Sequence, residues 1–189
     1  MIPNDRAFNG KYFFEFDGKI FYRYQRIEKA GKYRLKIKLV SKNTPYKQGI
    51  AISFSTEPTF RGIILINGVP LLPVKKKHFA HVISEELFDC NELEIEILIE
   101  EGFLLFCNAS DISEDYQEIF SKIQKIVNNP LERVNRENFT SGFSAGNLYG
   151  NAFWIENITK NKYRFYCNDH RMDDDFDDLI FDLEVKYSQ

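Results

Sequence analysis

The segment KYRLKIKLV, residues 32–40, constrains the possible folds more than any other part of the chain. Its apolar residues alternate with basic ones at Arg34, Lys36 and Lys38. Because successive side chains of a β-strand point to opposite faces, this period of two predicts a strand with one face in a core and the other in water. The sequence therefore predicts a β-sheet whose outer face is basic along this strand.

Short β-rich runs continue along the chain and are separated by turn residues. Asp17-Gly18 predicts a tight hairpin between two aromatic runs, and Glu101-Gly102 predicts a second, longer hairpin. The further runs are GIAISFST, GIILING, HFAHVIS, AFWIENIT and KNKYRFYCND. Short strands at this spacing are typical of a β-sandwich or a β-barrel, and we expect the antiparallel sandwich. With 189 residues, 43% of them hydrophobic, the chain can bury one full core, so we expect a single domain over residues 1–189.

One segment departs from the β pattern. Residues 111–129 carry apolar side chains at helical spacing, from Tyr116 to Val127, and a proline follows them. This pattern predicts one amphipathic α-helix inserted between strands, covering an open end of the core. The next segment, residues 131–151, is rich in glycine and polar residues and predicts a long loop.

Charge is distributed unevenly although the net charge is only −3. Residues 1–90 contain 16 basic and 8 acidic side chains, and residues 91–189 contain 9 and 20. Basic and acidic strands that lie side by side in one sheet would neutralise each other. The alternative is single-stranded nucleic-acid binding through the Arg34, Lys36 and Lys38 face, near aromatic residues. The overall acidity argues against it, because phosphate binding is driven by basic side chains.

The N-terminus shows no signal-peptide pattern, and no run approaches the roughly 20 apolar residues of a membrane helix. Cys90, Cys107 and Cys167 lie far apart and form no C-x-x-C pair, so we expect buried free thiols inside a cell. The default expectation is therefore a cytoplasmic protein without membrane insertion.

The pentapeptide GFSAG, residues 142–146, matches the G-x-S-x-G pattern of a hydrolase nucleophile, with Ser144 at its centre. That motif requires a buried strand before the serine and a helix after it. Neither pattern is present in the flanking sequence, so hydrolysis by Ser144 is an alternative and a non-catalytic protein is favoured.

The C-terminal stretch CNDHRMDDDFDDLIFDLEV, residues 167–185, holds eight acidic residues among nineteen. Apolar residues from Leu179 onward occupy every second position, which predicts a final strand with one face in the core. The acidic entrance to that strand is then a loop, whose carboxylates repel one another unless water, basic partners or a cation compensates them. One interpretation is calcium, which tolerates irregular oxygen coordination better than magnesium does. The other is a solvated or lysine-paired acidic edge.

The motif D-x-D-F-D-D-L-I-F, residues 173–181, resembles the aspartate-rich strand entrance D-x-D-F-[ND]-D-L of several bacterial surface and adhesin-type β domains associated with calcium. The order of AGKYRLKIKL and EGFLLFCNAS is similar to that of galactose-binding-like jelly rolls, modules that often carry a structural calcium and bind glycans through loops. The resemblance implies a jelly-roll sandwich. The calcium ligands it implies are Asp173, Asp175, Asp177 and Asp178, with Asp169 as a further candidate.

Three aromatic residues lie in or beside the glycine-rich loop, namely Phe143, Tyr149 and Trp154. Aromatic faces stack on sugar rings, so these residues are candidates for a carbohydrate site. For Trp154 the alternative is a place in the core. Together, the sequence leads us to expect a non-catalytic, calcium-binding β-sandwich module whose partner is a carbohydrate or a protein.

Overall fold

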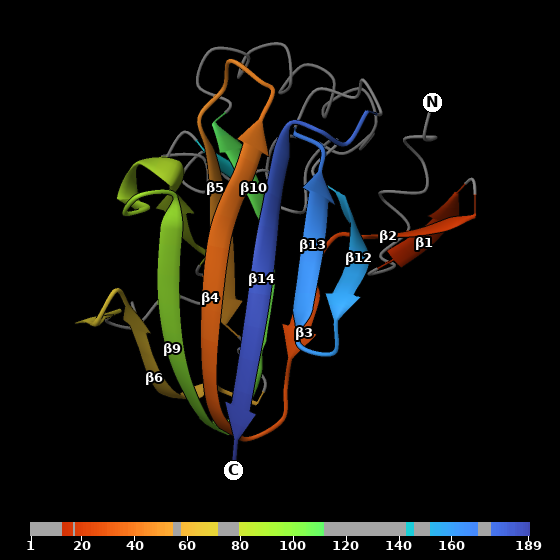
Figure 1. Ribbon diagram of the computed structural model, residues 1–189. Coiled ribbons are helices and arrows are strands. Elements are labelled where there is room, and N and C mark those ends of the chain that lie inside the picture. The colour runs from red at the N-terminus through yellow and green to blue at the C-terminus, as the bar shows by residue number, and fades with distance from the viewer. Residues whose placement is uncertain are drawn as a thin grey trace, which may run out of the picture.

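The computed structural model describes residues 13–16, 18–54, 58–71, 80–111, 143–145, 152–169 and 175–189. Its strands form two antiparallel sheets that pack face to face with the core between them (Figure 1). The mainly β, antiparallel sandwich expected from the sequence is therefore confirmed.

The larger sheet has nine strands in the order β1-β2-β12-β13-β14-β4-β9-β6-β7. Their bounds are β1 Phe13–Phe16, β2 Lys19–Tyr22, β12 Phe153–Thr159, β13 Lys162–Cys167, β14 Leu179–Ser188, β4 Gly31–Lys42, β9 Glu92–Glu101, β6 Arg61–Ile66 and β7 Val69–Pro70. The long strands β14, β4 and β9 form its centre, so most of the core rests on their inner faces.

The smaller sheet has the order β11-β10-β5-β8, and a fifth strand, β3, pairs with β10. Their bounds are β11 Phe143–Ala145, β10 Leu104–Asp111, β5 Gln48–Phe54, β8 Ala80–Ser84 and β3 Gln25–Ile27. Strand β3 pairs only with Leu104–Phe106, and β11 only with Ala109–Asp111, so two short strands share one side of β10.

The alternation along residues 32–40 is confirmed in β4. Leu35 and Ile37 are buried. The basic residues that alternate with them, Arg34, Lys36 and Lys38, are exposed. In the final strand, β14, Leu179 and Phe181 face the core as expected, whereas Asp182, expected to face water, is also buried. Burial of each such apolar side chain contributes roughly 1.5–3 kcal/mol, which explains why these strands keep their register.

Three phenylalanine rings join the two sheets in the middle of the core. Phe106 of β10 contacts Phe165 of β13 and Phe181 of β14, with ring centroids 6.0 and 6.2 Å away. Phe165 and Phe181 stack on each other at 4.7 Å. Such pairs add about 0.5–1.5 kcal/mol beyond the burial of area, so they fix the two sheets against each other here.

The outer face of β4 is not a net basic surface, because β9 places glutamates opposite its basic residues. Arg34 Nε lies 3.2 Å from Glu94, and Lys36 Nζ lies 2.9 Å from Glu92. The hydrogen bond from Lys36 is the main cause that lowers the pKa of Glu92, and the same bond raises the pKa of Lys36. The charges of this face are therefore compensated within the sheet, as the pairing of basic and acidic strands predicts.

The prediction of a second hairpin at Glu101-Gly102 is wrong. The chain does turn at Gly102, which has a φ of +84°, but β9 belongs to the large sheet and β10 to the small one. Each strand has an apolar face, and both faces contribute to the core between the two sheets. The two strands therefore lie in opposite sheets of the sandwich and do not pair with each other. The first hairpin is confirmed, since β1 pairs with β2 around Gly18 at a φ of +71°.

The helix expected over residues 111–129 lies outside the described residues, except for Asp111, which ends β10. In the described part of the chain, the one helical element is the short 3-10 turn η1, Glu85–Leu87, and no helix there has the length and apolar sequence of a membrane span. Within the expected loop 131–151, the described residues Phe143–Ala145 form the edge strand β11.

Candidate functional site

The acidic stretch of the sequence connects β13 to β14. Asn168 and Asp169 directly follow β13, and Asp175 to Asp178 directly precede β14. Both ends of this connection contact the link between β4 and β5. Asn43 Nδ2 donates to Asp177 Oδ2 at 3.0 Å, and Thr44 Oγ1 donates to Asp169 Oδ2 at 2.9 Å. Two links of the chain, far apart in sequence, therefore meet at one end of the sandwich.

Phe176 gives the acidic turn its shape. Its φ is +58°, in the left-handed region that costs a non-glycine residue roughly 1–2 kcal/mol. The ring is buried and lies 4.6 Å from the ring centroid of Phe21, and this burial offsets the cost of the backbone conformation. The reversal at Phe176 leaves the carboxylates that flank it close together.

Asp175, Asp177 and Asp178 each place one carboxylate oxygen within 4.8 Å of the others. Asp175 is exposed, Asp177 is half-buried and Asp178 is buried, so the group spans from the surface into the protein. Oδ1 of Asp177 is inaccessible to solvent and has no hydrogen-bond partner among the described residues. Carboxylate oxygens at this spacing repel one another and are the donor type that hard cations such as calcium require.

Asp169 lies beside this three-carboxylate group but is not one of its members. It is 1% exposed, and its backbone N–H donates to Oδ2 of Asp178 at 2.8 Å. Its own Oδ2 accepts the hydrogen bond from Thr44. In this arrangement Asp169 orients Asp178 through its backbone and holds the β4–β5 link through its side chain.

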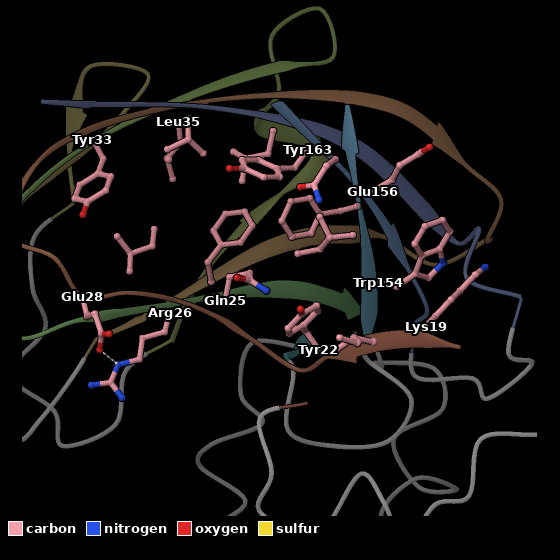
Figure 2. A pocket seen from close by; sticks show the side chains of 18 of the residues that line it. Lys19, Tyr22, Gln25, Arg26, Glu28, Tyr33, Leu35, Trp154, Glu156 and Tyr163 are labelled. Carbon is pink, nitrogen blue, oxygen red and sulfur yellow. Dashed lines mark ion pairs between the residues drawn. The ribbon is translucent and has the colours of Figure 1, made fainter. Parts of the chain in front are cut away.

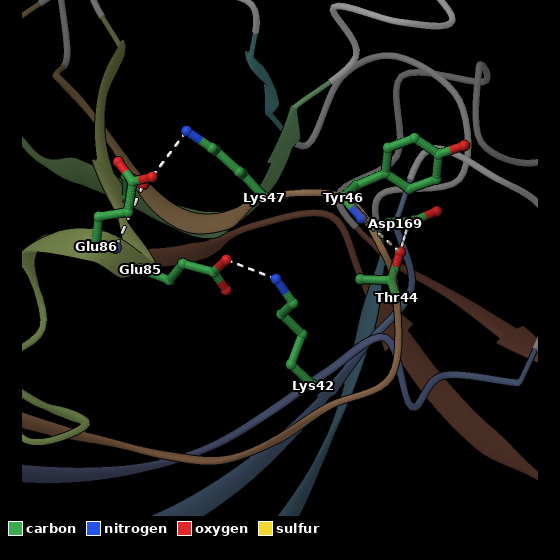
Figure 3. A network of polar contacts seen from close by, with 8 residues as sticks. Lys42, Thr44, Tyr46, Lys47, Glu85, Glu86 and Asp169 are labelled. Carbon is green, nitrogen blue, oxygen red and sulfur yellow. Dashed lines mark hydrogen bonds and ion pairs between the residues drawn. The ribbon is translucent and has the colours of Figure 1, made fainter.

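Figure 3 shows how the β4–β5 link is fixed. Lys42 Nζ lies 2.6 Å from Glu85 Oε1, and Lys47 Nζ lies 2.7 Å from Glu86 Oε1, so both ends of the link are paired with η1 (Figure 3). The Lys42–Glu85 pair is the less exposed of the two. These contacts keep Thr44 in reach of Asp169 and Asn43 in reach of Asp177.

The structure thus brings together three of the five aspartates predicted as metal ligands and places Asp169 next to them. Asp173 lies outside the described residues. The signal that found the group was the clustering of acidic residues before an apolar strand. The parts that sequence did not reveal are the left-handed Phe176 and the supporting residues Asn43 and Thr44.

The residues predicted to bind carbohydrate are placed in different sheets. Phe143 lies in β11 of the small sheet, Trp154 lies in β12 of the large sheet, and Tyr149 lies outside the described residues. Trp154 is half-buried and its ring stacks on Tyr166, with centroids 4.0 Å apart and planes 2° apart. The ammonium of Lys19 lies over the Trp154 ring, 4.1 Å from its centroid. The Tyr166 ring covers one face of the Trp154 ring and the Lys19 ammonium covers the other, so both faces of Trp154 contact the protein.

Ser144 lies in the middle of β11, where its backbone pairs with Ser110 of β10. An edge strand differs from the sharp strand-to-helix turn that a G-x-S-x-G nucleophile needs. The alternative of a hydrolase therefore gains no support from the local backbone.

Two features had no signal in the sequence. One is an ion-pair group on the outer face, in which the buried Asp182 of β14 binds Arg164 and Lys162 of β13. The other is a cavity of about 880 Å³ between the sheets (Figure 2). Both are built by neighbours that only the strand order brings together, so no local motif could have indicated them.

Comparison of the chain with protein-family models, with curated proteins and with solved structures finds no match. The functional conclusions below therefore rest on the residues and geometry of this chain.

Proposed function

We propose that this protein is a non-catalytic β-sandwich binding module in which Asp175, Asp177 and Asp178 hold a calcium ion. The observation that carries the proposal is the approach of three carboxylates to within 4.8 Å, with one solvent-inaccessible oxygen of Asp177 that lacks a described partner. An unpaired buried carboxylate oxygen costs on the order of 1–3 kcal/mol, and a cation would remove this cost.

Calcium fits these residues better than the other common ions do. All three side chains offer oxygen, whereas structural zinc sites use histidine and cysteine. The group runs from an exposed to a buried carboxylate, so it is open on one side and irregular. Calcium accepts such geometry with water as further ligands, whereas magnesium demands near-octahedral coordination. Asp173, predicted from the sequence, remains a proposed ligand, and Asp169 is proposed as the residue that orients Asp178.

The proposed fold type is the galactose-binding-like jelly roll, which two facing antiparallel sheets support, and the proposed partner is a carbohydrate or a protein. Trp154 is the aromatic residue best placed for such a partner among those described. Because its ring already contacts Tyr166 and Lys19, a sugar ring would stack on it only after displacing the Lys19 ammonium. Single-stranded nucleic-acid binding and hydrolysis by Ser144 stay alternatives from the sequence, without a supporting observation.

The calcium site is tested by calorimetry and thermal unfolding of the full chain in chelator, in excess calcium and in excess magnesium. At a calcium concentration 100 times Kd, binding adds about 2.7 kcal/mol, which raises the Tm of a chain of this size by about 5–11 °C. Asp177→Asn should abolish this rise and leave Tm in chelator unchanged or higher, because it also removes repulsion. Glu100→Gln removes one charge on β9 and is the matched control.

No calcium binding by calorimetry, together with equal Tm in chelator and in calcium, would refute the metal site.

The partner is tested separately. Trp154 is the single tryptophan of the chain, so its fluorescence reports directly on a glycan that contacts it. A glycan array with and without calcium, followed by titration of each hit, should give a shift in Trp154 fluorescence. Trp154→Phe leaves no tryptophan to observe, so its loss of glycan binding is measured by calorimetry. Hits that leave the fluorescence unchanged would exclude Trp154 from the partner surface.

A further inference from the structure

A cavity lies between the sheets at the side where β3 faces β12 and β13 (Figure 2). Its volume is about 880 Å³. Cavities of roughly 300–1,000 Å³ are typical of sites for small molecules. The cavity is separate from the acidic turn, since none of the three clustered aspartates lines it.

The path of the chain between β2 and β3 explains why this side stays open. Strand β2 ends at Tyr22 in the large sheet, and β3 begins at Gln25 in the small sheet, so two residues cross from one sheet to the other. Strand β3 is only three residues long and covers one end of β10. Among the described strands, β3 and β10 therefore face only part of the inner side of β12 and β13.

The walls of the cavity are mostly apolar. They are formed by residues of five strands of the large sheet, β2, β4, β12, β13 and β14, together with β3 and Phe106 of β10. The principal wall residues are Leu35, Ile155, Phe165, Leu183 and Val185. Contact with such walls favours a ligand whose body is aromatic or aliphatic, because each apolar group removed from water contributes about 25 cal/mol per Å².

Gln25 supplies a polar group to this apolar space. Figure 2 shows its side chain between the Arg26 and Glu28 end of the cavity and Tyr22. It is half-buried and belongs to the lining of the cavity. A primary amide offers both donors and an acceptor and carries no charge, so it selects a hydroxyl, amine, amide or carbonyl group.

The charged residues at the rim are already engaged with the protein. Arg26 Nε lies 2.8 Å from Glu28, the Lys19 ammonium lies over Trp154, and the Lys29 ammonium lies 4.5 Å from the ring centroid of Tyr187. The remaining rim carboxylate, on Glu156, accepts a hydrogen bond of 2.9 Å from Tyr166. An ionic ligand would have to break one of these contacts, whereas a neutral ligand would not.

We propose that this cavity binds a neutral, mainly apolar small molecule with one hydrogen-bonding group that reaches Gln25. The apolar walls determine the body of the ligand, Gln25 determines its polar group, and the engaged rim disfavours a charged ligand. The site is independent of the proposed calcium site, so each can fail without the other.

Two dyes of nearly identical shape test the proposal. N-phenyl-1-naphthylamine is neutral and carries one N–H donor, and 8-anilinonaphthalene-1-sulfonate adds a single sulfonate. Both fluoresce in apolar surroundings and accept energy from tryptophan. Because Trp154 is the single tryptophan and lines the cavity, a dye bound there quenches its emission. We expect saturable binding of the neutral dye to one site, with affinity at least tenfold higher than that of the sulfonate.

Variants of the full chain place the dye. Gln25→Leu should weaken the neutral dye about three- to tenfold, the effect of one hydrogen bond. Val185→Phe, which fills the cavity from β14, should reduce binding more than tenfold. Val40→Phe is the matched control on the exposed outer face of β4 and should change nothing.

Thermal unfolding checks that each variant is folded, and if Val185→Phe fails to fold, the Gln25→Leu result decides. Three outcomes would overturn the proposal: no saturable binding of the neutral dye, equal binding of both dyes, or affinities that Gln25→Leu leaves unchanged.

Discussion

Replacing Asp182 with asparagine should destabilise the fold in a manner that depends on pH. Asp182 is 5% exposed, and its two carboxylate oxygens accept three contacts from two neighbouring residues. Arg164 Nε lies 2.7 Å from Oδ1 and Nη2 lies 3.2 Å from Oδ2, while Lys162 Nζ lies 2.9 Å from Oδ2. Asparagine keeps the shape of the side chain but retains one acceptor oxygen and no charge.

The magnitude follows from these contacts. A hydrogen bond to a charged group contributes about 1.5–3 kcal/mol, and two of the three are lost or weakened. The side chains of Arg164 and Lys162 are 32% and 39% exposed, so water compensates part of the loss. We expect a net loss of about 2 kcal/mol at pH 7, which corresponds to a Tm lower by about 4–8 °C for a chain of this size.

The hydrogen bond from Arg164 is the main cause that holds the pKa of Asp182 below its ordinary value of 3.8. A carboxylate with a lowered pKa in the folded state stabilises the protein above the unfolded pKa and loses this contribution as the pH falls through the folded pKa. The difference in Tm between wild type and Asp182→Asn should therefore be full at pH 5–8 and shrink below pH 3.8.

Circular dichroism melts of both proteins between pH 2.5 and pH 8 measure this difference. Glu184→Gln is the matched control, since Glu184 also lies on the outer face of β14 but its side chain is 40% exposed and makes one contact with Lys186. Such exposed pairs contribute about 0–1 kcal/mol. Equal melting of wild type and Asp182→Asn at pH 7, or a difference that stays constant down to pH 2.5, would refute the role of this ion-pair group.

Two further predictions concern the cysteines and a glycine. Cys107 and Cys167 are buried as expected, whereas Cys90, on the turn before β9, is exposed. Burial raises the pKa of Cys107 to about 12 and also raises the pKa of Cys167, so a disulfide reagent at pH 8 should titrate only Cys90 in the native protein and all three thiols in denaturant. Fast reaction of two native thiols would contradict the buried positions. Gly62→Ala should lower the free energy of unfolding in urea by about 3 kcal/mol, because the added Cβ would collide with the backbone carbonyl of Leu98. Gly68→Ala, at a φ of +79° with no neighbour within 4 Å, should lower it by about 1 kcal/mol. Equal urea midpoints for the two variants would show that the clash at Gly62 relaxes.

The cluster of aspartates at the proposed calcium site was predictable in part because its members are close together in sequence. Asp175, Asp177 and Asp178 lie within four positions and precede an apolar strand, so a local pattern was enough to propose them together. Their support was not predictable, because Asn43 reaches Asp177 from a link more than 130 residues away in sequence. The cavity around Gln25 belongs to the same category, since its walls come from strands dispersed over the whole chain.

For the long strands, the sequence by itself determined which residues form a strand and which face carries the core residues, as β4 and β14 show, whereas β11 was expected to be part of a loop. This information is local, because the period of two in apolar residues depends only on neighbours along the chain. Only the tertiary structure decided which strands pair. The turns at Gly18 and Gly102 look alike in sequence, yet the first joins two strands of one sheet and the second joins β9 and β10 of opposite sheets. A turn residue fixes a change of direction, whereas the choice of sheet depends on how all the apolar faces can be buried together.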